Sequence, residues 1–196
     1  MNRPVLLRTW GCRGRWDSSI FGNDTGTTRA VRRRDQILNS SKGETLDTQE
    51  TVRRHIGALL SGQRLATLST CNADGHPYAS LVAFDADPDL SGMIFATSRA
   101  TRKFANLSHE PRAAMLVDNS GNVKSDIYAA MAVTALGVTM ELSGADQDQA
   151  VARYILKHPH MAAFVQAPST AVLRLKVDVY YLVNRFQKVM EYHVGR

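Results

Sequence analysis

The stretch that decides the fold reads Met93-Ile94-Phe95-Ala96-Thr97-Ser98-Arg99-Ala100-Thr101-Arg102-Lys103-Phe104. An apolar strand ends there in hydroxyl residues and runs directly into a helix, predicted over Thr101–His109, whose first turn carries Arg102 and Lys103. Basic side chains at a helix N-terminus oppose the helix dipole, at a cost of about a few tenths of a kcal/mol, unless an anion binds there. Free backbone N–H groups, hydroxyls, a guanidinium and an ammonium are the groups that hold a phosphate monoester. The stretch therefore indicates either a phosphate site or two basic side chains that are simply solvated.

Short segments with a period close to two surround this stretch on both sides. Turn-favouring residues at 72–75 and 87–92 separate the first three of them. Many short strands with few helices are typical of a β-barrel or β-sandwich, not of a doubly wound sheet. The predicted strands are Arg64–Thr70, Tyr78–Asp85, Met93–Thr97, Ala113–Asp118, Ala130–Glu141, Val172–Val183 and Lys188–His193.

Two more helices are predicted around the strands. Asp47 and Glu50 have the spacing at which two side chains cap a helix start, and Gly62 is placed to end that helix. A second helix is predicted over Ala145–His158. The first helix has one apolar stripe that should cover an end of the barrel, formed by Val52, Ile56, Leu59 and Leu60.

The segment Leu81-Val82-Ala83-Phe84 is apolar on both faces of its predicted strand. A strand tolerates this pattern only when both faces are covered. We therefore expect this strand to be central in the sheet or to lie at a dimer interface.

The net charge of +6 is concentrated at the N-terminus. Residues 1–42 hold nine basic and three acidic residues, so the rest of the chain is neutral overall. These residues show no apolar periodicity, and we predict a flexible basic segment over 1–42 followed by one domain over 43–196. An organelle transit peptide, a nucleic-acid contact and a dispensable start remain alternatives for the segment, and nucleic acid is the less favoured partner.

No apolar run in the sequence approaches the length of about 20 residues that crosses a bilayer, so we expect a soluble protein without a membrane partner. The two cysteines, Cys12 and Cys71, form neither a disulfide framework nor a metal-binding pair, which favours a reducing, cytoplasmic location. His158-Pro159-His160 is the one suggestive histidine spacing, and we predict no metal there because proline extends the chain.

The order of motifs resembles the pyridoxamine 5'-phosphate oxidase-related, FMN-binding split-barrel family. The resemblance covers roughly residues 48–193 and is densest between Leu65 and Val117. It implies a mostly β (α+β) fold, an antiparallel split β-barrel with peripheral helices. The motifs that carry it are Leu65–Thr70, Asp74–Val82, Phe95–Thr97, Thr101–Lys103, Asn106-Leu107 and Glu110–Ala113.

The same resemblance implies a homodimer that holds FMN between its subunits. The strand Ser80–Ala83 would follow the flavin edge through backbone atoms, and the Thr101–Lys103 segment would hold the FMN phosphate. Loop residues and residues near the C-terminus would contribute at the flavin or the interface. The implied cofactor-binding residues are Ser80, Leu81, Val82, Ala83, Ala96, Thr97, Thr101, Arg102, Lys103, Asn119, Asp126, Arg185 and Gln187.

Two positions depart from the oxidases of this family. Ser80 and Asp85 stand where those enzymes carry an arginine and a lysine. We therefore predict an FMN-dependent oxidoreductase for another small-molecule substrate. The alternatives are a haem-binding or haem-utilisation protein, with a histidine such as His193 as axial ligand, and a flavin-binding module without turnover.

Overall fold

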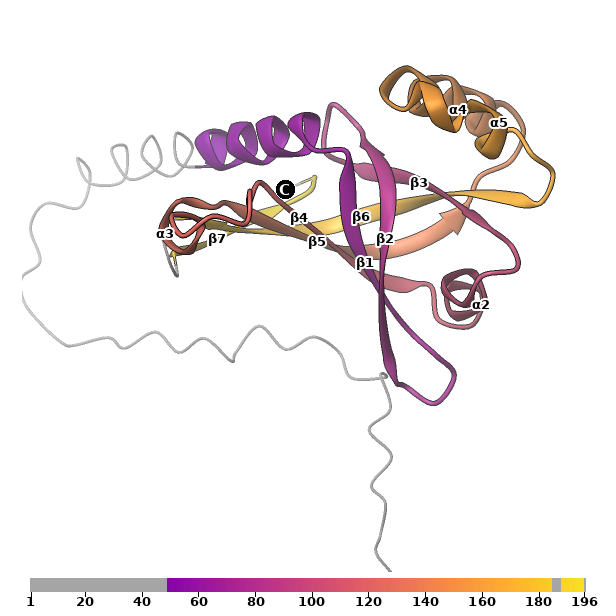
Figure 1. The fold of residues 1–196 in the computed structure, drawn as a ribbon, viewed down its shortest axis with the longest axis horizontal. Coiled ribbons are helices and arrows are strands. Elements are labelled where there is room, and N and C mark those ends of the chain that lie inside the picture. Colours follow the sequence, from indigo (N-terminus) through magenta and orange to yellow (C-terminus); the bar gives the residue numbers. More distant parts are fainter. Residues whose placement is uncertain (1–48, 185–187, 196) are drawn as a thin grey trace, which may run out of the picture.

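A closed antiparallel barrel forms the centre of the molecule (Figure 1). The structure, a computed structural model, describes residues 49–184 and 188–195. The sheet order is β3-β2-β1-β4-β5-β6-β7, and an additional pairing of β3 with β6 closes the first six strands into a barrel. The strands are β1 Leu65–Cys71, β2 Pro77–Ala86, β3 Gly92–Ser98, β4 Arg112–Asp118, β5 Ala132–Glu141, β6 Thr170–Asn184 and β7 Lys188–His193. The predicted mostly β split barrel with peripheral helices is confirmed.

The barrel is split between β2 and β3. The first seven residues of β2, Pro77–Ala83, all pair with β1. In contrast, β2 pairs with β3 only over its last three residues, Phe84–Ala86. The end of β3, Ala96–Ser98, then pairs with β6 alone. One edge of β2 therefore has no strand partner along Pro77–Ala83 among the described residues.

Side chains that alternate along the strands fill the barrel. Val82 and Phe84 of β2 point inward and are buried, as the period of two requires. Each large apolar side chain that is fully buried contributes about 1.5–3 kcal/mol of transfer free energy. Among the residues that are fully buried in this core are Leu68, Phe84, Phe95, Met115, Tyr180 and Leu182.

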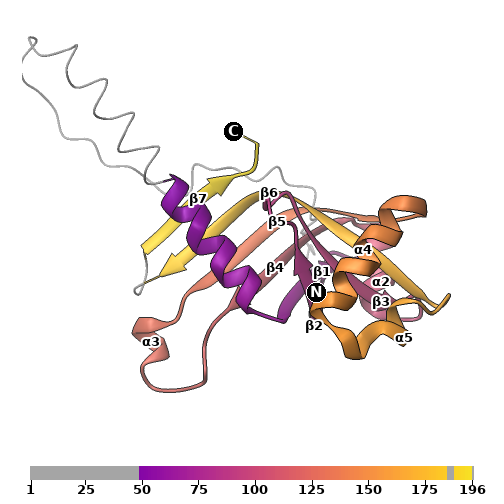
Figure 2. The same cartoon turned by 90° about the horizontal axis from the view of Figure 1, so that it is seen from above.

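A helix over residues 49–62 adds its apolar stripe to the same core (Figure 2). All four predicted stripe residues, Val52, Ile56, Leu59 and Leu60, are buried there. The predicted cap residue Asp47 and the basic segment over 1–42 lie outside the described residues.

Helices α4 (Gly144–Lys157) and α5 (Ala162–Val165) cover the outer face of β3 and β6. A second apolar cluster joins Ile94 and Val172 of the barrel wall to Tyr154 and Val165 of the helices. Because the barrel core buries Met93 and Phe95 and the helices bury Ile94 and Ala96, every residue of β3 from Gly92 to Thr97 is buried.

The strand that is covered on both faces along its length is thus β3. The sequence predicted this for the Leu81–Phe84 segment of β2. As expected, β2 is central between β1 and β3 in the sheet order, but the outward-facing side chain of Leu81 is 66% exposed in the single chain. The apolar pattern of β2 is therefore only partly explained by contacts within one chain.

Sequence reasoning missed three short helical segments, namely α3 (Asp126–Ala129), η2 (Pro159–Met161) and α5. The second predicted turn contains one residue in the left-handed region. The residue with positive φ there is Leu90, at 66°, whereas Gly92 belongs to β3. The turn predicted at 72–75 is observed: Gly75 has φ of 82°, and the side chain of Asn72 accepts hydrogen bonds from Asp74 N and His76 N.

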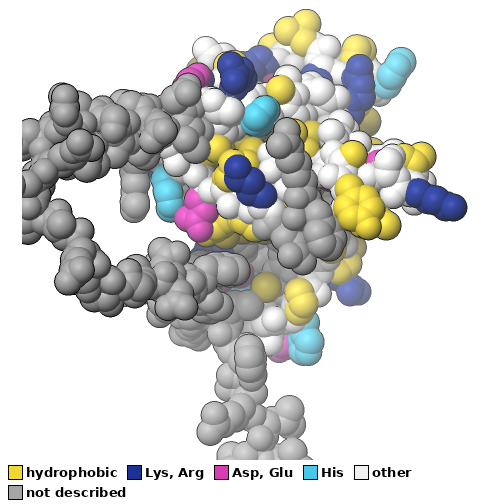
Figure 3. All heavy atoms as spheres, turned by 90° about the vertical axis from the view of Figure 1, so that its left-hand side faces the viewer, with side chains coloured by type: hydrophobic (Ala, Val, Ile, Leu, Met, Phe, Trp, Pro, Cys, Tyr) yellow, Lys and Arg dark blue, Asp and Glu magenta, His cyan; other side chains and the backbone are white. Residues whose placement is uncertain are grey.

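Charged and apolar side chains are interspersed on the described surface that faces the viewer in Figure 3. None of the described helices has the length and apolar character that crossing a bilayer requires.

Candidate functional site

The turn from β3 into α2 (Arg102–His109) is built around two threonine hydroxyls. Thr101 is the N-cap of α2, with extended backbone angles, and its Oγ1 accepts a hydrogen bond from Phe104 N at 3.4 Å. The same hydroxyl donates to Ser98 O at 2.8 Å. Thr97 must therefore donate to Thr101 across the 2.9 Å that separate the two oxygens. The protons of both hydroxyls are already used within the turn.

Three basic side chains emerge from this turn, and one of them is neutralised. Arg99 forms two hydrogen bonds with the carboxylate of Glu141 on β5. Its guanidinium also lies over the Phe104 ring, with Cζ 5.4 Å from the ring centroid. Arg99 is therefore committed to contacts that hold the turn in place.

Arg102 and Lys103, which we call the α2 cation pair, have no such carboxylate. Within the described residues no acidic group lies at ion-pair distance from either side chain, and the first turn of α2 contains no acidic residue. The first N–H groups of a helix have no acceptor within the helix. Two cations and free N–H donors thus meet at one helix end, an arrangement that favours an anion.

This helix end lies beside the unpaired edge of β2. Arg102 reaches across to Tyr78 of β2, and its Cζ is 5.5 Å from the centroid of the tyrosine ring. Asn106 of α2 donates to the hydroxyl of Thr70 on β1 at 2.9 Å. The α2 cation pair is therefore held next to backbone that lacks a strand partner.

The β2 residues singled out in the sequence lie along this edge. Ser80 pairs with Leu68 of β1, and its Oγ is buried without a hydrogen-bond partner in the part of the chain that the structure describes. Leu81 faces outward, Val82 faces the core, and Ala83 O accepts a hydrogen bond from the Tyr154 hydroxyl at 3.3 Å. Ala96 and Thr97 lie across the split on β3, and both are buried.

Two further predicted site residues, Asn119 and Asp126, are not brought to α2 in the single chain. Asn119 Oδ1 accepts from Met131 N at 2.7 Å, and Asp126 Oδ2 accepts from Gly121 N and Val123 N, both at 2.9 Å. These bonds brace the β4–β5 connection, which lies at the opposite end of the molecule from α2 in both ribbon views (Figures 1 and 2). Arg185 and Gln187 lie outside the described residues.

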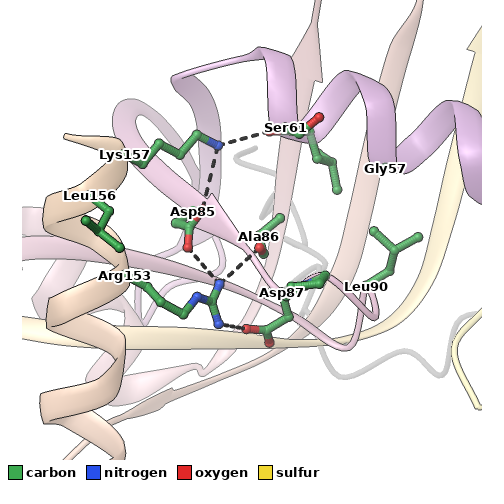
Figure 4. Close-up of a pocket in the computed structure, with 11 residues that line it drawn as sticks. Gly57, Ser61, Asp85, Ala86, Asp87, Leu90, Arg153, Leu156 and Lys157 are labelled. Carbon is green, nitrogen blue, oxygen red and sulfur yellow. Dashed lines mark hydrogen bonds and ion pairs between the residues drawn. The ribbon is translucent and has the colours of Figure 1, made fainter.

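Asp85 points to α4 and away from the α2 cation pair. Its carboxylate is 2.7 Å from Nη2 of Arg153, whose Nη1 is 2.6 Å from Asp87 (Figure 4). Arg174 completes this group by pairing with Asp87. We call these four residues, Asp85, Asp87, Arg153 and Arg174, the α4 charge cluster. Sequence reasoning missed the cluster because its members are far apart in the chain.

A cavity of about 480 Å³ lies between α4 and the helix over residues 49–62, beside the α4 charge cluster (Figure 4). Lys157 lines it and donates to Leu60 O at 3.0 Å, and burial lowers the pKa of its ammonium. Because the charged groups of this cavity bond to one another or to backbone, they leave little for a ligand to neutralise.

The described residues contain no group of three potential metal ligands. His158 is buried, and its Nε2 lies 2.8 Å from Phe84 O. His193 is 3.4 Å from the carboxylate of Glu191 at the surface.

Comparison with known proteins agrees with the fold. A family model described as pyridoxamine 5'-phosphate oxidase matches residues 52–184. No curated protein matches the chain in sequence.

Three solved structures illustrate the similarity. The haem-binding protein from Mycobacterium smegmatis is 20% identical with a TM-score of 0.63, over 70% of this chain and 56% of that one, so this chain spans little more than half its length. HutZ, the haem storage protein from Vibrio cholerae, is 17% identical with a TM-score of 0.57, over 63% of this chain and 88% of HutZ. An FAD-binding protein from Mesorhizobium loti is 16% identical with a TM-score of 0.50, over 64% of this chain and 88% of that one.

Proposed function

Because the chain belongs to the pyridoxamine 5'-phosphate oxidase family, we propose that it is a flavoprotein that binds FMN and uses it as an oxidoreductase on a small organic substrate. The observation that carries this proposal is the α2 cation pair. Arg102 and Lys103 lie at a helix N-terminus without carboxylate partners in the described residues. A phosphate group there would offset the unfavourable interaction of both cations with the helix dipole.

The unpaired edge of β2 supports the same ligand. A flat heterocycle with polar atoms on its rim can bond to backbone groups along Pro77–Ala83 that no strand satisfies. The orphaned hydroxyl of Ser80 lies on this strand as well. The donor set therefore fits a phosphorylated flavin, with the phosphate at α2 and the ring system along β2.

FMN when bound would supply the redox chemistry, and the protein would bind it, orient it and exclude water. Arg102 and Lys103 would hold the phosphate charge. Thr97 and Thr101 would act through the turn they stabilise, because their hydroxyl protons are used within it.

The substrate we propose is not pyridoxamine 5'-phosphate. A second phosphate needs its own donors. Ser80 carries no charge, and Asp85 is held by Arg153 on the α4 side. Neither position can replace the basic groups that the oxidases of this family carry there.

Haem binding is the second candidate function. It is favoured by the structural neighbours, two of which are named for haem binding or haem storage. A flavin-binding module without turnover is a third reading of the same site.

An absorption spectrum of the purified protein separates flavin binding from haem binding. We expect the visible absorption bands of an oxidised flavin and no Soret band. FMN and riboflavin are then titrated into flavin-free wild type and into the double variant Arg102→Ala/Lys103→Ala. Charge-assisted bonds contribute about 1.5–3 kcal/mol each, so the FMN Kd should rise well over tenfold and the riboflavin Kd much less.

The control variant removes two equal charges elsewhere, from Arg54 and Lys176, which are exposed. Arg54→Ala/Lys176→Ala should bind FMN as wild type does. Equal FMN affinity in the wild type and the Arg102→Ala/Lys103→Ala variant would exclude the phosphate assignment.

We also propose that the working unit is a cytoplasmic homodimer. Outward-facing apolar side chains lie together on the sheet, because Leu81 and Leu116 flank Thr67 in the strand register. Leu81 is 66% and Leu116 39% exposed in the single chain. A second copy that covers this face would account for the apolar outer face of β2.

Leu81→Arg should break such a dimer, because it places a charge in the interface core. Sedimentation should give twice the chain mass for wild type and the chain mass for Leu81→Arg. Glu141→Gln, a surface change on β5, should leave the mass unchanged. A monomeric wild type that binds FMN tightly would exclude the dimer.

A further inference from the structure

Each of the two arginines of the β3–α2 turn lies over a different aromatic ring. The Phe104 ring lies under Arg99, which Glu141 neutralises. The Tyr78 ring lies under Arg102, which has no carboxylate partner in the described part of the chain. Tyr78 is thus the contact that places the one arginine of the turn whose charge is available.

The position of Tyr78 is fixed from the barrel side. Its backbone pairs with Thr70 of β1, and its carbonyl oxygen accepts a hydrogen bond from Thr70 Oγ1 at 3.3 Å. Thr70 Oγ1 in turn accepts from Asn106 Nδ2 of α2 at 2.9 Å, and both side chains are buried. This chain of hydrogen bonds ties β2, β1 and α2 together directly beneath the Tyr78–Arg102 contact.

A guanidinium held over a ring by a cation–π contact makes that contact without using its N–H groups as hydrogen-bond donors to other side chains. An arginine side chain otherwise loses rotamer entropy when a ligand immobilises it. A ring that restricts the side chain beforehand reduces the part of this loss that binding must overcome. The contact therefore leaves Arg102 both oriented and able to donate two parallel hydrogen bonds to a phosphate.

We infer that Tyr78 is a positioning residue that preorganises Arg102 for the phosphate of the bound flavin, and so sets the preference for FMN over riboflavin. This inference rests on the proposed function, because it takes the α2 cation pair to be the phosphate site. It assigns Tyr78 no contact with the flavin itself.

The test compares Tyr78→Leu, which removes the ring, with Tyr78→Phe, which keeps it. FMN and riboflavin dissociation constants are measured by flavin fluorescence in wild type, in each variant and in each variant combined with Arg102→Ala. A cation–π contact at a partly exposed site corresponds to about a two- to fivefold change in affinity. Tyr78→Leu should weaken FMN by this factor and leave riboflavin unchanged, and Tyr78→Phe should match wild type.

The combined variants separate positioning from a general structural effect. In the Arg102→Ala background, Tyr78→Leu should cause no further loss of FMN affinity. An equal loss for FMN and riboflavin, or an undiminished loss in the Arg102→Ala background, would overturn the inference. If Tyr78→Leu does not fold, Tyr78→Met is measured in its place under the same criteria.

The result also separates this inference from the proposed function. If Arg102→Ala/Lys103→Ala binds FMN as wild type does, the phosphate site itself is wrong. If that double variant loses FMN and Tyr78→Leu does not, the site stands and the role of Tyr78 is refuted.

Discussion

The α2 cation pair and the α4 charge cluster use the same residue types in opposite ways. In the α4 charge cluster both arginines contact carboxylates, and Asp87 accepts from Arg153 and from Arg174. In the α2 cation pair, no carboxylate of the described chain lies at ion-pair distance. Each region joins a helix to the barrel.

This difference distinguishes charged side chains that stabilise the fold from charged side chains that are available to bind a ligand. A buried pair is costly to break, because removing one partner leaves the other charge uncompensated. An unpaired exposed cation costs little to remove and can be slightly unfavourable where it stands. Substitutions in the α4 charge cluster should therefore lower the stability of the fold and leave flavin binding unchanged. Substitutions in the α2 cation pair should weaken FMN binding and change the stability little.

The largest effect is expected from Asp87→Ala. Asp87 is 5% exposed and accepts hydrogen bonds from Arg153 and Arg174, so its loss leaves two guanidiniums short of a carboxylate. We expect the free energy of unfolding to fall by about 2–4 kcal/mol, measured by urea denaturation. The ratio of FMN to riboflavin affinity should not change.

The control for Asp87→Ala is Glu141→Gln, which breaks the more exposed pair with Arg99. This change should cost less than about 1 kcal/mol. Equal losses in the two variants would mean that burial does not distinguish these ion pairs.

An intermediate effect is expected at Glu110, whose carboxylate accepts hydrogen bonds from Arg112 at 2.6 and 2.9 Å. These bonds lower the pKa of Glu110 to about 2. Because the folded pKa lies below the unfolded value, the pair stabilises the fold above about pH 4.5, and this contribution is lost as the pH falls toward 2. Between pH 6 and pH 3, Glu110→Gln should lose on the order of 1 kcal/mol less stability than wild type in urea titrations. Identical acid sensitivity of the two proteins would contradict this assignment.

The smallest effect on stability is expected from Arg102→Gln/Lys103→Gln in flavin-free protein. The melting temperature should stay the same or rise slightly, because two cations leave a helix N-terminus, a gain of about a few tenths of a kcal/mol. With saturating FMN the order should reverse, since wild type gains more from the ligand. If the flavin-free variant were as unstable as Asp87→Ala, the α2 cation pair would have a structural role and not a ligand-binding one.

Local patterns account for the part of the fold that the sequence predicted. The helix predicted over Thr101–His109 is observed as Arg102–His109 with Thr101 as its cap, and the last predicted strand, Lys188–His193, has the observed bounds. Both are determined by residues a few positions apart. The α2 cation pair was found for the same reason, because its residues adjoin the end of a strand.

Contacts between distant segments account for what was missed. The partners of Asp85 and Asp87, Arg153 and Arg174, lie on α4 and β6, and no spacing in the sequence relates them. The contact of Tyr78 with Arg102 depends on where β2 and β3 separate, which is a property of the whole barrel. Leu90 adopts positive φ although its side chain is buried, so packing outweighs local preference there.

Closure of the barrel through β3 and β6 depends on a strand that is synthesised late. Gly92 pairs with Lys176 and Ser98 with Thr170, so β3 finds this partner only after most of the chain has left the ribosome. Until then its edge, which includes Met93, Ile94 and Phe95, is open to pairing with other chains. Such distant pairing also makes folding slow. Nascent chains that stall before residue 170 should therefore be the aggregation-prone form of this protein.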